Sequence, residues 1–304
     1  MNSKMAALAV LLAALLWGTT GTAQSFAPDN TSPLAFGAVR LTIGGLFLLG
    51  YSLSRKRLQL KGLPPGALLT SSLGMALYQP LFFSGVHMTG IAVGTVVALG
   101  SAPVIAGLLE WGLTGRRPAA KWWIATAAAI IGSGLLFLGQ HSMDIQPAGL
   151  LLSAGAGAAF AIYTLSSKKL LERHYPETAA AVVFCLSALW LSPILLFTDL
   201  SWLMSARGAV VSLHIGLAAT GIAYLLFNFG LSLLPASTTV TFSLAEPLVA
   251  SLLGVFLIGE SLSGFAWLGI LLLLGGITLL TISSHERQPR KLKNSLGNKI
   301  KSRP

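Results

Sequence analysis

Charged residues are scarce in this sequence, and so is cysteine. Only 10% of the 304 residues are charged, whereas 54% are hydrophobic. Soluble domains carry roughly a quarter charged residues, so this composition excludes an ordinary soluble domain. The single cysteine, Cys185, excludes an intrachain disulfide, and the chain shows no thiolate metal site.

Groupings of residues typical of catalysis are also missing. Enzymes gather histidines or carboxylates to hold metals or to transfer protons, but here the histidines are scattered and no two carboxylates share a helix turn. No nucleophile–base pair is evident, and no Gly-x-x-x-x-Gly-Lys-Ser/Thr loop occurs that would bind a nucleotide. We therefore expect no metal site, no cofactor and no enzymatic activity.

Long hydrophobic stretches fill the chain instead. A helix of about 20 apolar residues crosses a hydrocarbon core about 30 Å thick, and ten such stretches can be marked. They predict an all-α integral membrane protein with ten transmembrane helices, the first being a retained helix rather than a signal peptide. The predicted spans are Met5–Phe26, Pro33–Leu53, Ala67–Val86, Ala92–Trp111, Lys121–Gly139, Ala148–Ser167, Thr178–Phe197, Gly208–Leu231, Ala236–Ile258 and Phe265–Ser283.

Basic residues cluster in alternate loops. The net charge of +11 could suggest a nucleic-acid partner, but the positions of Lys and Arg follow the positive-inside rule. With the N-terminus in the cytoplasm, all of them except Arg40 and Arg207 fall on the cytoplasmic side. This predicts a multi-pass plasma-membrane protein with both termini cytoplasmic. The basic tail 284–304 is then a topogenic signal, as we favour, or a contact for anionic membrane lipid.

The second half of the chain repeats the first. Sliding Pro103 onto Pro247, a shift of 144 residues, aligns further residues. Each half has five spans, an odd number, so the second half must run upside down relative to the first. We expect two inverted five-helix repeats at 5–139 and 148–283, and inversion explains why a basic residue is exchanged for an acidic one. The aligned pairs are Trp123 with Trp267, Gly132 with Gly276, and Arg116 with Glu260.

Several motifs carry a family resemblance. The second half contains Gly-Ile-Ala-Tyr-Leu-Leu-Phe-Asn at 221–228, Ala-Glu-Pro-Leu-Val-Ala at 245–250 and Gly-Glu-Ser-Leu at 259–262. The first half adds Leu-Trp-Gly at 16–18 and Ser-Ala-Pro at 101–103. Together they resemble the EamA-type family of the drug/metabolite transporter superfamily, from about residue 5 to residue 283. The resemblance implies a ten-helix exporter of amino acids, other small metabolites or toxic compounds in a bacterial inner membrane.

Two ionisable residues lie inside predicted spans, where each costs about 2.5–3.5 kcal/mol. Glu246 precedes Pro247, which removes a backbone donor and bends the helix. Pro103 takes the matching place, and interrupted helices at matching positions indicate a transporter site. Glu246 either binds a substrate amine or a coupling proton, or it is protonated and holds its helix to a neighbour by hydrogen bonds. Arg40 either binds a substrate carboxylate or, as we favour, snorkels toward the outer face or caps a loop.

Polar and aromatic residues recur at helical spacing in several spans. Polar faces should turn toward the bundle interior or a cavity, and aromatic rings could surround a cation or an amino-acid side chain. For each residue the alternative is a helix-packing seam joined by hydrogen bonds, but for the set we expect a cavity. The candidates are Trp17, Thr20 and Gln24 in the first span, Tyr78 and Gln79 in the third, Tyr163 in the sixth, and Tyr224 and Asn228 in the eighth.

These features predict a secondary active transporter. We expect it to export a small organic solute, an amino acid or a related metabolite, by alternating access. A proton gradient is the expected energy source, with Glu246 as the coupling residue. A drug or organic-cation efflux carrier is the alternative. A membrane-embedded enzyme, a lipid-handling protein or a channel is less favoured, because an inverted repeat fits alternating access better.

Overall fold

The computed structural model describes residues 3–136, 146–253, 255–256 and 262–286, and these residues form helices and turns without a strand. Glu260, at which a charge exchange is predicted, and residues 287–304 of the basic tail lie outside the described residues. The helices are α1 (Ser3–Ser25), α2 (Pro33–Ser54), α3 (Pro65–Thr89), α4 (Ile91–Thr114), α5 (Ala120–Leu136), α6 (Pro147–Leu170), α7 (Pro176–Leu196), η1 (Ser201–Met204), α8 (Ala206–Leu213), η2 (His214–Ile222), α9 (Ala223–Leu233), α10 (Ala236–Ser243), α11 (Ala245–Leu253) and α12 (Gly264–Glu286).

Proline and glycine set many of the helix boundaries. Four helices, α2, α3, α6 and α7, begin with a proline in the first turn. Proline is suited to this position because its missing N–H would have no partner there and its φ angle is already helical. At the other end of α4, Gly115 adopts a left-handed φ of 68°, which glycine reaches without strain. Local sequence therefore defines these helix ends.

Eight helices of the described chain are long and apolar enough to cross a membrane. Two of them are composite, since α8, η2 and α9 run together over Ala206–Leu233, and α10 and α11 over Ala236–Leu253. The helix α5 is apolar but shorter, at 17 residues. The helix α3, at 25 residues, is long enough but less apolar. The protein is thus an all-helical, multi-pass membrane protein, but length and apolarity alone support eight spans rather than the predicted ten.

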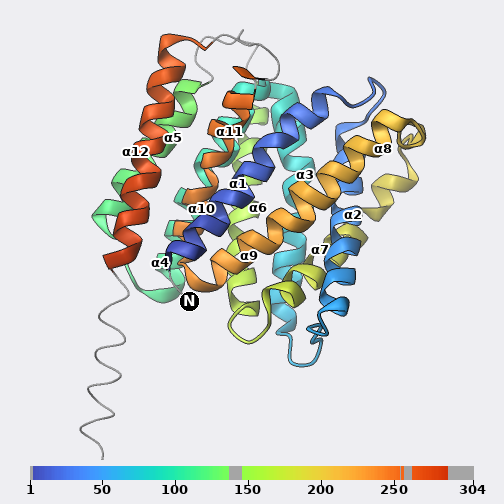
Figure 1. Cartoon of the computed structure of the whole chain (residues 1–304), viewed down its shortest axis with the longest axis horizontal. Coiled ribbons are helices and arrows are strands. Elements are labelled where there is room, and N and C mark those ends of the chain that lie inside the picture. Colours follow the sequence, from blue (N-terminus) through green and yellow to red (C-terminus); the bar gives the residue numbers. More distant parts are fainter. Residues whose placement is uncertain (1–2, 137–145, 254, 257–261, 287–304) are drawn as a thin grey trace, which may run out of the picture.

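The helices form a bundle with α5 and α12 at one edge and α2 and α7 at the other (Figure 1). The helix α1 and the composite of α8, η2 and α9 cross the bundle diagonally. The most extensive contacts join α3 to α6, α5 to α12, α2 to α7, α4 to α6, and α1 to both α9 and α11. The largest buried cluster draws residues from both halves of the sequence, so neither half encloses this core alone.

The crossing of α5 and α12 is reciprocal. A Cβ atom added to Gly132 would lie 2.7 Å from the carbonyl oxygen of Gly269, and one added to Gly276 would lie 2.7 Å from that of Ala125. Shifting Gly132 by 144 residues gives Gly276, and shifting Ala125 by 144 residues gives Gly269. The repeat therefore maps each of these two contacts onto the other. The two helices run in opposite directions (Figure 1). Such exchange is the signature of a two-fold axis.

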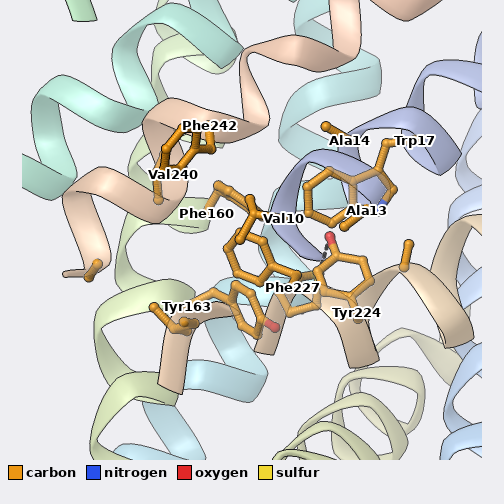
Figure 2. Close-up of a cluster of buried hydrophobic side chains, with 14 of the residues drawn as sticks. Val10, Ala13, Ala14, Trp17, Phe160, Tyr163, Tyr224, Phe227, Val240 and Phe242 are labelled. Atoms are coloured by element: carbon orange, nitrogen blue, oxygen red, sulfur yellow. Dashed lines mark hydrogen bonds between the residues drawn. The ribbon is translucent and has the colours of Figure 1, made fainter. Parts of the chain in front are cut away.

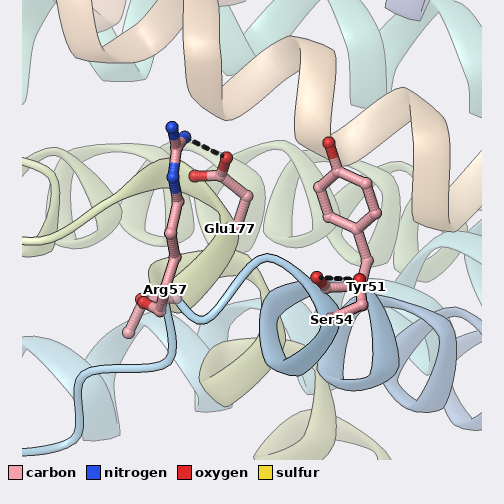
Figure 3. A network of polar contacts seen from close by, with 5 residues as sticks. Tyr51, Ser54, Arg57 and Glu177 are labelled. Atoms are coloured by element: carbon pink, nitrogen blue, oxygen red, sulfur yellow. Dashed lines mark hydrogen bonds and ion pairs between the residues drawn. The ribbon is translucent and has the colours of Figure 1, made fainter.

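One end of the bundle holds the start of α1, the end of α12 and the turns at 55–64, 115–119 and 171–175 (Figure 1). The first of these turns is fixed to the start of α7. Arg57 Nη1 donates to Glu177 Oε1 over 2.8 Å (Figure 3), and the Arg57 guanidinium lies 5.0 Å above the Tyr175 ring. The hydroxyl of Thr178 donates to the Arg57 carbonyl. The basic turn after α2 is therefore an ordered part of this end, which we call the N-terminal end.

Candidate functional site

A cavity of about 430 Å³ lies between the two halves of the chain. Its walls come from α1, α2, α3, α4, α6, α9, α10 and α11, and its volume suits a small organic molecule. Most of the candidate residues face it. Those lining the cavity are Trp17, Thr20, Gln24, Arg40, Tyr78, Gln79, Tyr224, Glu246 and Pro247.

Arg40 lines the cavity from α2 and is only 8% exposed. Its Nε donates to Thr220 Oγ1 over 3.1 Å and its Nη2 to the Ala219 carbonyl over 3.3 Å. It forms no ion pair within the described residues. The side chain therefore does not snorkel to the outer face, contrary to the interpretation favoured from sequence. Arg40 places a buried cation, held only by neutral acceptors, beside an open space.

Glu246 lines the cavity at an interruption in its helix. The helix α10 ends at Ser243 and α11 begins at Ala245, two residues before Pro247, which cannot donate to the Ser243 carbonyl. No hydrogen bond reaches the Glu246 carboxyl group from the described residues, so the hydrogen bonds of the structural alternative are not formed. The interruption leaves the carboxyl group available to a molecule in the cavity.

Aromatic rings form much of the remaining wall, and Figure 2 shows three of them, Trp17, Phe160 and Tyr224, in one buried cluster. The Trp17 ring lies 4.9 Å from the Tyr224 ring and 6.2 Å from the Phe160 ring, and Phe160 lies 5.6 Å from Tyr78. Contacts at these distances stabilise ring pairs beyond their buried area. These rings fix one another, so the wall is preorganised. Their π faces could hold an apolar side chain or a cation.

Tyr163 and Asn228 are buried and do not line the cavity. Both are at most 1% exposed, and Asn228 Nδ2 donates to the Tyr163 hydroxyl over 3.3 Å. The Tyr163 ring lies 5.8 Å from both Phe160 and Tyr224 (Figure 2). The sixth and eighth spans turn these two residues toward each other, so the cavity does not support their predicted role in substrate binding, which stays a prediction.

The predicted interruption at Pro103 is also absent. The helix α4 continues through Pro103 from Ile91 to Thr114, and Pro103 does not line the cavity. A single proline removes one backbone hydrogen bond, and the helix tolerates this loss here. The two repeats therefore differ at this point, since only the second has a divided helix.

Sequence reasoning missed several cavity residues, among them Thr95, Phe160 and Ser243. Two of them carried a usable signal. Phe160 precedes Tyr163 by three residues and Ser243 precedes Glu246 by three, so each shares a predicted helix face with a predicted residue. Thr95 carried no such signal, because it reaches the cavity through the packing of α4.

The cavity extends toward one end of the bundle. It is lined by Gln24 and Ser25, which are exposed at the end of α1 farthest from the N-terminal end. At the N-terminal end, the turn between α9 and α10 is held by Glu110 and Lys168. Glu110 accepts from the backbone N–H groups of Ala236 and Ser237 over 3.1 and 2.9 Å, and Lys168 Nζ donates to the Leu231 and Leu234 carbonyls. The cavity therefore has exposed lining residues at the far end of the bundle.

Comparisons with known proteins agree with this arrangement. The EamA-like transporter family matches residues 4–138 and again residues 147–282. The uncharacterized transporter YwfM of Bacillus subtilis (strain 168) is 50% identical over 97% of this chain and 98% of its own length. The threonine/homoserine exporter RhtA of Escherichia coli (strain K12) is 29% identical over 91% of this chain and 90% of its own. A solved crystal structure with 22% identity superposes with a TM-score of 0.81 over 95% of this chain and 100% of the other, which shows a shared fold.

Proposed function

Because the chain belongs to the EamA-like transporter family, we propose that it is a secondary active exporter of a zwitterionic solute, with amino acids as the substrate class. The cavity carries the proposal. It holds a cationic group, Arg40, and a carboxyl group, Glu246, that form no ion pair with each other. An amino acid would place its carboxylate on Arg40 and its ammonium near Glu246, with its side chain among the aromatic rings.

Two-fold packing supports transport by alternating access. The chain is proposed to cross the membrane ten times as two inverted repeats, 5–139 and 148–283, so that the shorter α5 and the less apolar α3 also span. The reciprocal crossing of α5 and α12 supports this arrangement. The cavity lies between the halves, where inverted-repeat transporters bind their substrates.

The position of the basic turns supports an orientation in the membrane. Turns with Arg55, Lys56, Arg116 and Arg117 lie at the N-terminal end of the bundle (Figure 1). The positive-inside rule assigns this end, and with it both termini, to the cytoplasm of a bacterial inner membrane. The cavity then extends toward the outer face, as expected for an exporter after it has carried its solute outward.

The substrate class also draws on a relative. RhtA is a threonine/homoserine exporter, so L-threonine and homoserine are the first solutes to test here. An organic cation is the second candidate, because Glu246 and the rings of Trp17, Tyr78 and Tyr224 could bind one. Arg40 in the same cavity disfavours a solute that carries only positive charge.

Counterflow in proteoliposomes tests this proposal. The purified protein is preloaded with L-threonine, homoserine, an aromatic amino acid or tetraethylammonium, and labelled uptake is followed with and without a pH gradient. We expect saturable exchange of an amino acid that responds to the gradient, and Glu246→Gln should lose that response. The exposed carboxylate of Glu172 provides the matched control, Glu172→Gln. Exchange of tetraethylammonium alone, or flux that never saturates, would overturn the amino-acid assignment or the carrier mechanism respectively.

A further inference from the structure

The segment η2 is a π-helix within an otherwise α-helical span. Thr220 of this segment contacts Arg40. Short π-helical segments inside α-helices are frequently found at functional sites. Here Arg40 Nη2 donates to a backbone carbonyl of the segment, that of Ala219. The irregular turn thus accepts hydrogen bonds from a cavity residue.

Thr220 fixes the direction of hydrogen bonding in this contact. Its hydroxyl donates to the Ile215 carbonyl, five residues earlier, over 2.8 Å. A hydroxyl has one proton, so the same oxygen can only accept from Arg40 Nε. The resulting chain runs from Arg40 through Thr220 to Ile215. Thr220 is fully buried and does not line the cavity itself.

Close packing keeps the partners of Arg40 in place. Gly44 lies one turn beyond Arg40 on the same face of α2, and a Cβ there would lie 2.4 Å from Thr220 Cγ2. A Cβ added to Gly216 would lie 2.4 Å from Ile43 Cγ2. The helix α2 and the π-helix η2 therefore each contribute a glycine to their contact, and this close packing leaves Thr220 little freedom to move.

The guanidinium keeps part of its donor capacity for a ligand. Arginine has five N–H groups, and these two bonds use one on Nε and one on Nη2. No further hydrogen bond joins Arg40 to the described residues, so three N–H groups remain beside the cavity. A buried guanidinium with free donors and no carboxylate partner is suited to a bidentate anion.

We propose that Thr220 is the positioning residue that holds Arg40 with its free edge toward the cavity, where it binds the carboxylate of the solute. This inference rests on the proposed function, since it assigns a carboxylate-bearing solute to the cavity. It adds a residue outside the cavity, and it gives the π-helical turn a role in specificity.

Thr220→Val tests the proposal because valine keeps the shape of threonine and removes only the hydroxyl. Counterflow is measured with L-threonine and with 1-aminopropan-2-ol, which lacks the carboxylate. We expect Thr220→Val to raise the KM for L-threonine about tenfold, as is typical when a hydrogen bond to a charged group is lost. The maximal rate should stay within about twofold, and the KM for the amine should not change. Thr220→Ser should restore the wild-type KM.

A matched control is Thr239→Val, which removes a buried hydroxyl of α10 that donates to the Pro235 carbonyl outside the cavity. It should leave both KM values unchanged. Equal changes in KM for both solutes in Thr220→Val, or no change in either, would overturn the positioning role.

A second measurement separates this inference from the proposed function. If the wild type exchanges neither solute, the transport proposal fails, and thermal unfolding of the purified protein in sodium propionate against sodium chloride tests the anion site alone. We expect propionate to raise the Tm of the wild type and of Thr220→Ser but not of Arg40→Gln or Thr220→Val. No stabilisation of the wild type, or equal stabilisation of Thr220→Val, would contradict the inference.

Discussion

Arg40 and Glu246 are residues that a bilayer interior disfavours, and each has a different reason to be there. Each costs about 2.5–3.5 kcal/mol to insert. Arg40 recovers part of this cost through two hydrogen bonds to a π-helical turn. Glu246 receives no hydrogen bond from the described residues and lies at a helix interruption. The protein thus retains two residues whose hydrogen-bonding groups are not fully satisfied by the described residues.

For individual residues, the sequence predicted which kinds of side chain line the cavity better than it predicted their contacts. Helical spacing placed Trp17, Thr20 and Gln24 on one face, and that face lines the cavity. The same reasoning did not predict that Tyr163 and Asn228 would contact each other outside the cavity lining, because periodicity does not say which of two buried neighbours a helix face will meet. No sequence pattern signalled the bond between Arg40 and Thr220, since 180 residues separate them.

Tyr163→Phe tests the distinction between cavity and core. Removing the hydroxyl leaves Asn228 Nδ2 without its partner, in a residue whose Oδ1 already has none. We expect the protein to lose about 1–3 kcal/mol of stability, seen as a lower Tm in detergent, with an unchanged KM. The matched change in the cavity wall, Tyr78→Phe, should instead alter KM. A raised KM with an unaltered Tm in Tyr163→Phe would return Tyr163 to the substrate site.

At the scale of helices, glycine determines how closely α5 and α12 approach. Helix association within lipid depends on close van der Waals packing, because burial from water no longer drives it. The α5–α12 crossing brings Gly132 and Gly276 against backbone atoms of the opposite helix. The sequence predicted that both glycines belong to equivalent helices, since they align in the repeat. It could not predict that these helices contact each other, because that depends on how the two halves associate.

Neighbouring glycines of α12 allow a controlled test of this crossing. Alanine at Gly276 would place its Cβ 2.7 Å from the Ala125 carbonyl oxygen, whereas Gly275 has nothing within 4 Å. We expect Gly276→Ala to cost about 1–3 kcal/mol of stability through overpacking. Gly275→Ala should be neutral or slightly stabilising, because alanine favours the helix. Thermal unfolding of both variants in the same detergent measures the difference, and equal Tm values would contradict the crossing.

At the scale of the whole molecule, the two halves enclose one cavity that extends toward the end away from the N-terminus. The sequence predicted a membrane bundle and a repeat because both the lengths of the apolar stretches and the matching residues can be read directly from it. It predicted Pro103 and Pro247 as equivalent interruptions, yet only the second helix is divided. The repeat is therefore approximate at the site itself.

Access to the cavity is the most direct test of this account. The only cysteine, Cys185, is replaced by alanine, and Gln24→Cys then introduces a thiol at a cavity residue in the last turn of α1. A membrane-impermeant thiol reagent is added from outside, and counterflow of L-threonine is measured before and after. The account predicts that modification blocks counterflow and that excess L-threonine slows the modification. A fully modified thiol with undiminished counterflow would show that the solute does not pass through this cavity.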